Sequence, residues 1–499
     1  MSYYLIGIGG TGARCLESFI HLNGAGLLKD SQPVKMFFVD ADVSCGNLAR
    51  TQNAAELYDK AAALNYGGTG IMANDLKTAQ TWTPVPESGA DLDSVFNIKL
   101  LENNTAEDIQ SQAMLYKALF TPQERTTPLD KGFRGHPAIG SAVMSTSIAG
   151  EEDKVWEELR QELTLDNDPR IFLFASVFGG TGAAGFPTIA RMISTLLPKN
   201  NEKEIPVHIG GALVLPYFSF PAAPSEEHLE MQAKSDEFML NTRSALEYYD
   251  KSDLLKTIFD SIYLIGDSDL HQVDTFSLGS NTQKNDANFI EIYAALAAFD
   301  FFNKKEFPEE RETPIIGRGD DEKPETLNAV TWEDLPDPCT YGPLKEKLAT
   351  YIKFLYAYKY CILPRLETCA LDKSRKSEFS WYIDLVQKQG KIDVHDDATI
   401  MSNFKNLGLY TEAFFAWLKQ ISTKKTRDIQ LVHELATEVP DGDFRGDLHR
   451  LIWGDTSHKD SLTASEFLKQ LCSYDPKEKG VDTSGAGFLM HAIYDICKN

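Results

Sequence analysis

The chain lacks three things that would assign it quickly: long apolar runs, paired cysteines and an excess of basic charge. Without a run of about 20 apolar residues, the sequence predicts no membrane-spanning helix. The seven cysteines are scattered, odd in number and without a C-x-x-C pair, which favours reduced thiols in a cytoplasmic protein over a disulfide scaffold. No basic stretch precedes the first apolar residues, so we expect no signal peptide.

The charge balance excludes a further class. Asp and Glu number 73 against 49 Lys and Arg, a net charge of −24, whereas non-specific binding to DNA or RNA depends on clustered basic residues. The histidines predict no metal site either. His433-Glu434 begins like a zinc-protease motif, but Thr437 occupies the position of its second histidine.

Apolar runs and amphipathic segments alternate over the first 303 residues. This alternation predicts an α/β fold with a parallel sheet and helices on both faces. After about residue 343 strand signals nearly vanish and helical patterns dominate. We therefore expect an α/β domain over 1–303, a linker or insertion over 304–342, and an α-helical C-terminal domain over 343–499. The expected strands are Tyr3–Ile8, Val34–Val39, Ile171–Phe178, Val207–Leu215 and Ser261–Ile265.

A glycine-rich turn follows the third of these strands. Gly179-Gly180-Thr181-Gly182-Ala183 leads into an apolar helix with Pro187 near its start. A strand, a small-residue turn and a helix in this order present free backbone N–H groups to an anion. Glycine also lets the backbone approach a phosphate closely. The pattern is equally typical of a tight turn without a ligand.

A second glycine turn, Gly7 to Gly12, follows the first strand and fits G-x-G-x-x-G. The next strand ends in Asp40-Ala41-Asp42, where a dinucleotide-binding unit places an acid on the ribose. An NAD(P)-dependent oxidoreductase is therefore an alternative. A third loop, Lys131 to Gly140, combines glycines with Arg134 before a small-residue helix, and either contacts phosphate or is an ordinary loop.

Together these loops resemble the tubulin/FtsZ superfamily of GTP-binding proteins, over about residues 1–335. The signature loop of that family is similar to the stretch from Phe178 to Pro187. The other matching segments follow in family order: Gly7–Gly12, Asp40–Asp42, Gly135–Gly140 with His136 in place of Asn, Pro216–Phe220 after the next strand, and Asn285-Asp286 before the long helix Phe289–Phe302.

The resemblance implies a tubulin/FtsZ-like domain that binds GTP or GDP with Mg²⁺. It also implies self-association, into filaments as in members of the family. It implies backbone contacts to the phosphates, groups beside the γ-phosphate and the metal, and side chains that read the base. The residues are Gly9, Gly10, Thr11, Gly12 and Gly179 to Ala183 for the phosphates, Arg134 and Gly135 near the γ-phosphate, Asp42 on the metal or phosphate side, and Asp267 with Asn285 or Asn288 for guanine.

The chain departs from the family at the catalytic loop, whose acid orients water in the next subunit's site. The residues directly after Phe302 do not fit. Leu327 to Leu335 fits loosely, with Glu333 or Asp334 as the acid; an acidic loop without a catalytic role is as good a reading. The expected function is thus a self-assembling GTPase. The alternative is a nucleotide-sensing module without turnover, for example in a bacterial defence system, whose helical C-terminal domain binds a partner protein.

Overall fold

The computed structural model describes most of the chain, and all structural statements concern the described residues. These are 2–85, 87–148, 153–196, 207–219, 235–252, 254–267, 269–273, 284–307, 329–337, 344–423, 427–440, 442–456, 458 and 460–499. Among them, no helix is long and apolar enough to cross a membrane.

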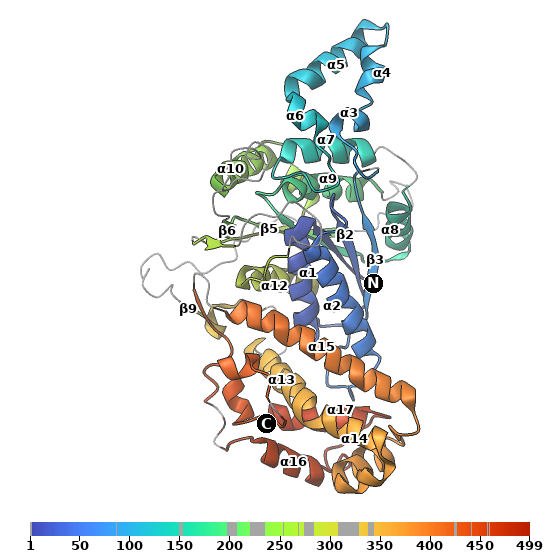
Figure 1. Ribbon diagram of the computed structural model, residues 1–499, viewed down its shortest axis with the longest axis vertical. Helices are drawn as coiled ribbons and strands as arrows, with labels where there is room; N and C mark the ends of the chain where they lie inside the picture. The colour runs from blue at the N-terminus through green and yellow to red at the C-terminus, as the bar shows by residue number, and fades with distance from the viewer. Residues whose placement is uncertain are drawn as a thin grey trace.

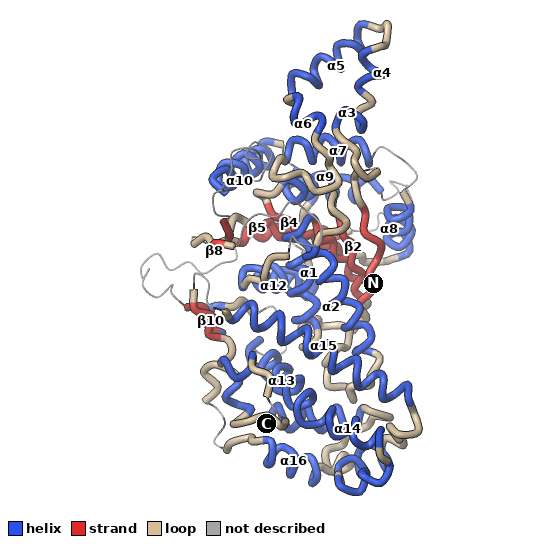
Figure 2. The backbone as a smooth tube through the Cα atoms, viewed as in Figure 1, coloured by secondary structure: helices blue, strands red, loops and turns tan. Residues whose placement is uncertain are grey.

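A six-stranded sheet forms the centre of the molecule, with the order β3-β2-β1-β4-β5-β7 and parallel pairing throughout (Figure 2). This confirms the parallel α/β fold, and all five expected strands are present. The sequence missed β3, which is polar and pairs at the edge of the sheet. The strands are β1 (Tyr3–Ile8), β2 (Val34–Val39), β3 (Leu76–Trp82), β4 (Arg170–Ser176), β5 (His208–Val214) and β7 (Ser261–Ile265).

Both faces of the sheet are covered, because alternate side chains of each strand enter different cores. In β1, Tyr3 and Leu5 join one core and Tyr4 and Ile6 the other. On the first face lie α1 (Gly9–Asn23), α2 (Gly46–Ala62) and α12 (Phe289–Asn303). On the second lie α7 (Pro137–Ile148), α8 (Lys154–Leu165) and α9 (Gly180–Leu196) (Figure 1).

Two further groups of elements flank this centre. Between β3 and α7, four short helices form an arm that projects from one end of the molecule (Figure 1). Between β5 and α12 come a two-stranded pair and two helices. These elements are α3 (Leu92–Val95), α4 (Ile98–Glu102), α5 (Glu107–Leu119), α6 (Pro122–Thr126), β6 (Phe218–Ser219), β8 (His271–Gln272), α10 (Ser235–Lys251) and α11 (Leu254–Ile258).

The C-terminal region is mostly helical, as expected. Its helices are α13 (Leu344–Ala357), a π-helical turn η5 (Tyr358–Ile362), α14 (Leu363–Leu371), a second π-helix η7 (Tyr382–Gln389), α15 (Ala398–Ser422), α16 (Ala464–Ser473) and α17 (Gly487–Lys498).

The helical pattern after residue 343 also predicts a helix over residues 428–437, and this prediction was wrong. This stretch instead contains β10 (Asp428–Gln430), which pairs in parallel with β9 (Ala329–Thr331), followed by a 3₁₀ turn, η8 (Glu434–Thr437). Pairing with a distant strand overrides the local helical pattern here.

The C-terminal helices continue the first core instead of forming a separate one. Helix α15 crosses α1 and α2 (Figure 1), and the Trp417 indole N–H donates to Ser18 Oγ at 3.2 Å. Apolar side chains from both parts of the chain belong to this one cluster. The helices after residue 343 therefore pack against α1 and α2, on one face of the sheet. The expected limits at 303 and 343 remain a prediction, and residues 308–328 and 338–343 lie outside the described ones.

Candidate functional site

A cleft lies beyond the carboxyl ends of β1 and β4, which are neighbours at the point where the strand order reverses. Open α/β sheets bind ligands at this place, because the loops leaving the two strands diverge there. The cleft brings together the two glycine turns, the acids after β2 and the loop before α7. Its lining residues are Gly9, Gly10, Thr11, Arg14, Asp40, Asp42, Cys45, Asn47, Lys131, Gly132, Phe133, Arg134, Gly135, Ser176, Phe178, Gly179, Gly180, Thr181, Gly182, Phe218, Phe238 and Asn285.

The glycines of the two turns serve two different needs. A Cβ on Gly12 would lie 2.6 Å from the Phe174 carbonyl oxygen, and one on Gly182 would lie 2.5 Å from the Ser176 carbonyl oxygen, so packing requires glycine at both. Gly9 has φ +72°, which other residues rarely adopt. A Cβ on Gly10 would meet nothing nearer than 3.4 Å. Packing therefore does not explain Gly10, whose free side faces the cleft.

Three helices begin at the cleft with their amide groups directed toward it. Helices α1 and α9 start in the glycine turns, and α2 starts after Cys45. None has an acidic residue in its first turn, and within the described residues no side chain caps α1. At the start of α2 the backbone N–H groups of Asn47 and Leu48 bond to the Cys45 sulfur. The free N–H groups at the start of α1 and the positive ends of three helix dipoles favour a bound anion.

Arg134 adds a positive side chain to this cleft. It is half-buried, and its backbone has φ +47°, an unusual conformation for a residue other than glycine. Its buried Nε has no hydrogen-bond partner among the described residues. Burial lowers the pKa of Arg134, and nearby Asp130 acts in the opposite direction. A buried, unpaired guanidinium nitrogen is costly, so an anion in the cleft would satisfy it.

Two buried carboxylates, Asp40 and Asp42, line the cleft just beyond the end of β2. Asp42 Oδ1 accepts the Ser44 backbone N–H at 3.0 Å and the Ser44 hydroxyl at 2.7 Å. Asp40 Oδ1 accepts the Asp42 backbone N–H at 3.2 Å. Burial raises the pKa of Asp40 from 3.8 to about 7. Carboxylate oxygens are the ligands that Mg²⁺ takes beside phosphates, so this side of the cleft fits the expected Mg²⁺.

The predicted base-reading residues separate in the structure. Asn285 lines the cleft; its backbone N–H donates to Asn47 Oδ1 at 2.9 Å and its carbonyl accepts from Arg50 at 2.7 Å. Neither bond uses its carboxamide. Asn288 instead caps α12, with Oδ1 accepting the Ile290 N–H at 3.1 Å.

Asp267 is also engaged elsewhere, in an ion pair with Arg427 at 2.6 Å. It and Asn288 are outside the set of residues that line the cleft. The positions of Asp267 and Asn288 therefore do not support a role in recognising the base of a nucleotide.

The two predicted catalytic acids also lie outside the cleft lining. They belong to a 3₁₀ turn, η4 (Trp332–Asp334). Asp334 Oδ2 accepts both the backbone N–H and the hydroxyl of Thr331, at 2.7 and 2.8 Å. The Glu333 side chain is 75% exposed, 3.8 Å from the Lys345 ammonium. Leu327, Asn328 and Phe220, which completed two of the matched loops, lie outside the described residues.

Several lining residues were not predicted from the sequence. Arg14 is the main one. It comes two residues after Gly12, the last glycine of the turn after β1, in a helix whose neighbouring positions are largely apolar. A lone cation at that place is a signal that could have found it. Asn47, Phe178, Phe218 and Phe238 carry no such signal, because amides and aromatic residues are common in any core.

The size of the cleft limits what the described residues enclose. Its volume is about 140 Å³, whereas pockets for whole ligands of drug size usually measure about 300–1,000 Å³. The enclosed space therefore suits the phosphate end of a nucleotide better than an entire one.

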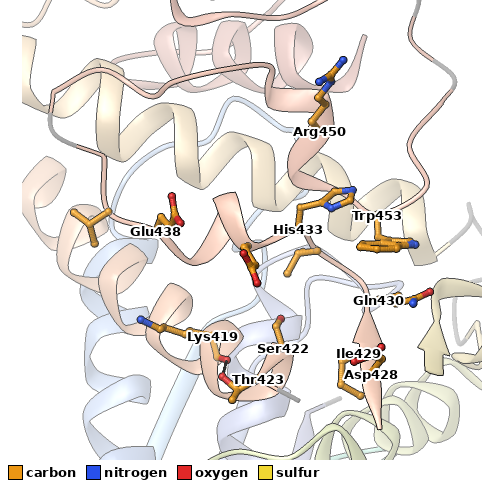
Figure 3. Close-up of a pocket in the computed structure, with 13 residues that line it drawn as sticks. Lys419, Ser422, Thr423, Asp428, Ile429, Gln430, His433, Glu438, Arg450 and Trp453 are labelled. Carbon is orange, nitrogen blue, oxygen red and sulfur yellow. Dashed lines mark hydrogen bonds between the residues drawn. The ribbon is translucent and has the colours of Figure 1, made fainter. Parts of the chain in front are cut away.

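A larger hollow lies among the C-terminal elements, between the end of α15, β10 and the segment around Trp453 (Figure 3). It measures about 1300 Å³, and the Trp453 ring stacks on His433 at 4.4 Å. Lys419 and Arg450 line it together with Asp428, Glu434 and Glu438. Because the lining carries charges of both signs and no helix N-termini converge on it, this hollow shows no preference for one class of ligand.

One group of described residues has the composition of a metal site: His449, Asp455 and His458 have ligand atoms within 4.8 Å of one another. The two imidazole rings, however, stack at 3.8 Å with 9° between their planes. Nitrogen lone pairs lie in the ring planes, so two parallel rings cannot both point at one ion. The Lys353 ammonium also lies 3.3 Å from His449 Nδ1. The group is a buried polar cluster.

Comparison with known proteins adds little to this geometry. No protein-family model and no curated protein matches the chain. Among solved structures, the chain is similar to CetZ2 from Haloferax volcanii in a GTPγS-bound protofilament, with 16% identity and a TM-score of 0.24. The match covers 53% of this chain and 49% of that chain, about half of each. A likeness this distant does not indicate what the chain does.

Replacing Arg134 by glycine should separate binding from stability. Glycine adopts φ +47° without strain, so we expect the free energy of unfolding in urea to change by no more than about 1 kcal/mol. Loss of a charged donor should weaken binding of inorganic triphosphate about 10- to 100-fold. Calorimetric titration measures this. An affinity equal to that of the unaltered chain would show that the guanidinium does not face the anion.

Asp40→Asn should change how stability depends on pH. Because the pKa of Asp40 is raised from 3.8 to about 7, between those values the folded chain keeps a proton that the unfolded chain releases. Asp40 therefore lowers stability progressively as pH rises through this window, and asparagine does not. With a chelator present, the variant's gain in free energy of unfolding should grow from pH 4 to pH 7 and then level off. A gain independent of pH would contradict this.

Proposed function

We propose that the chain is a tubulin-like protein that binds guanine nucleotide with its phosphates in this cleft. The observation that carries the proposal is the convergence of three helix N-termini, two of them in glycine turns, on a cleft at the switch point of the sheet. The unpaired Nε of Arg134 and the open side of Gly10 support it. Mg²⁺ would bind beside Asp42 and Asp40, where it would neutralise phosphate charge.

The preference for guanine rests on the resemblance of the loops in order, and on Asn285. Of the three candidate base readers, Asn285 alone is among the lining residues, and its carboxamide takes no part in the bonds that hold its backbone. We therefore propose Asn285 as the reader of the base edge.

The sheet order 3-2-1-4-5 is also that of dinucleotide-binding proteins, so strand order does not exclude NAD(P). A dinucleotide needs a long open groove, however. Here the loop over residues 131–135 and the glycine turn that begins at Gly179 enclose the phosphate side of the cleft, whose volume is about 140 Å³. This arrangement favours a single nucleotide over the oxidoreductase alternative.

We further propose that copies of the chain associate so that η4 of one approaches the cleft of the next. Glu333 is then the better candidate for orienting water, because its carboxylate is exposed. Asp334 is bound into its own turn by Thr331. That engagement of Asp334 also favours the second candidate function, a nucleotide sensor without turnover whose helical C-terminal region binds a partner protein.

Variants of Gly10 test the binding site directly. An acid in the first turn stabilises a helix, and a Cβ on Gly10 would meet nothing nearer than 3.4 Å, so we expect Gly10→Asp to fold. Its carboxylate would repel phosphates and weaken GTP binding about 100-fold. Gly10→Ala is the matched control and should lose less than about 5-fold. Equal affinities for all three proteins would place the phosphates elsewhere.

Hydrolysis is tested by phosphate release from GTP over a range of protein concentrations. If a neighbouring copy supplies the acid, the rate per chain should rise with concentration. Glu333→Gln should lower that rate about 100-fold without changing GTP affinity, while Glu434→Gln, another acid outside the cleft, should leave it unchanged. Absence of release at every concentration, with GTP bound, would favour the sensor.

A further inference from the structure

Arg14 is the most deeply buried basic side chain that lines the cleft. It belongs to the second turn of α1 and is 3% exposed. Helical side chains lean toward the N-terminus of their helix, which here is the end that opens on the cleft. Burying a guanidinium is expensive unless its donors are satisfied, so its partners need an explanation.

Two residues from distant elements hold the guanidinium in one orientation. Arg14 Nε donates to Glu291 Oε1 at 2.7 Å, from the first turn of α12. Arg14 Nη2 donates to the Tyr217 hydroxyl at 2.5 Å, and that hydroxyl donates to Glu291 Oε1 at 2.8 Å. The Nη2 group also lies 3.3 Å from Thr11 Oγ1. Arg14, Tyr217 and Glu291, from three separate parts of the chain, therefore share one hydrogen-bond network.

This network keeps Arg14 charged. Burial acts to lower the pKa of Arg14, but the oxygens of Tyr217 and Glu291 more than offset it, and the pKa lies above its ordinary value. Arg14 is therefore a permanent cation in the wall of the cleft.

The third nitrogen of the guanidinium remains unused. Arginine has five N–H donors in a fixed plane, and Nε with Nη2 provides three of them. Arg14 Nη1 has no partner among the described residues, and it is not among the fully enclosed unpaired atoms. The two remaining donors are thus accessible at a residue that lines the cleft.

We propose that Arg14 is a preset phosphate-binding residue, held by Glu291 and Tyr217 so that Nη1 donates both its N–H groups to phosphate oxygens of the bound ligand. The ligand class is a polyphosphate, since the two N–H groups of one nitrogen diverge and so suit oxygens of neighbouring phosphate groups. This inference rests on the proposed function for the statement that the polyphosphate belongs to a nucleotide.

The fixed orientation has a consequence for recognition. Because Glu291 balances the charge of Arg14 at 2.7 Å, the pair exerts little long-range attraction, and binding depends on the two directed hydrogen bonds. The contribution of Arg14 should therefore change little between low and high salt, since screening acts mainly on exposed, separated charges.

The test uses paired substitutions, because removing Arg14 alone would leave Glu291 buried and uncompensated. Arg14→Gln with Glu291→Gln removes both charges while the new amide can still accept the Asn288 backbone N–H. The control is Arg365→Gln with Asp443→Asn, an ion pair of 2.7 Å in the C-terminal region, whose members do not line the cleft. Binding of GTP and of inorganic triphosphate is measured for each full-length protein at low and high salt.

We expect the Arg14 pair of substitutions to weaken both ligands about 10- to 100-fold at either salt concentration, and the control pair to weaken them less than about 3-fold. Wild-type affinity for both ligands in the folded Arg14 variant would overturn this inference while the proposed function stands. Loss of triphosphate binding in that variant, with no GTP binding by the unaltered chain, would support the inference and refute the proposed function. If the unaltered chain binds neither ligand, both are refuted.

Tyr217→Phe keeps the test decisive if the double variant does not fold. It removes one of the two groups that orient the guanidinium and leaves the Arg14–Glu291 pair in place. We expect about 3- to 10-fold weaker binding of both ligands, and unchanged affinity would overturn the inference.

Discussion

The structure depends on the close contact between two strand-to-helix turns at the centre of the sheet. Helices α1 and α9 begin directly where β1 and β4 end, because Gly12 and Gly182 let each helix pass within van der Waals distance of a strand carbonyl. A Cβ on Gly9 would lie 3.3 Å from Thr181 Cβ, so the two turns also touch each other. Packing thus brings two sets of free amide groups to one place, and the chemistry of the cleft follows from it.

The parts that could be predicted from the sequence are those governed by local pattern. Buried strands appear as short apolar runs, and a glycine turn between a strand and a helix has few other conformations open to it. The two turns, Asp42 and Arg134 could therefore be assigned to one edge of a parallel sheet, and the structure brings all of them together in one cleft.

The parts that failed depend on contacts distant in sequence. Asp267 resembles a base reader in its loop, but Arg427, 160 residues away, takes both of its oxygens. Strand β10 forms because β9 lies beside it. The position of Arg14 after Gly12 marks it as a candidate, but its orientation depends on Tyr217 and Glu291, which no spacing rule connects to α1. In each case a side chain's role is decided by a partner that only the folded chain supplies.

Helix α12 connects the two halves of the proposed mechanism. Its first turn provides Glu291, which orients Arg14 at the cleft, while Tyr293, two residues on, donates its hydroxyl to the Asp334 carbonyl at 2.9 Å and so holds η4. The helix is almost completely buried, so its first turn cannot shift without repacking the core. The same rigid turn that presets Arg14 at the cleft therefore also supports the loop that carries Glu333. The orientation of the phosphate-binding cation and the position of the acidic loop thus depend on one buried element, and both are fixed before any ligand binds.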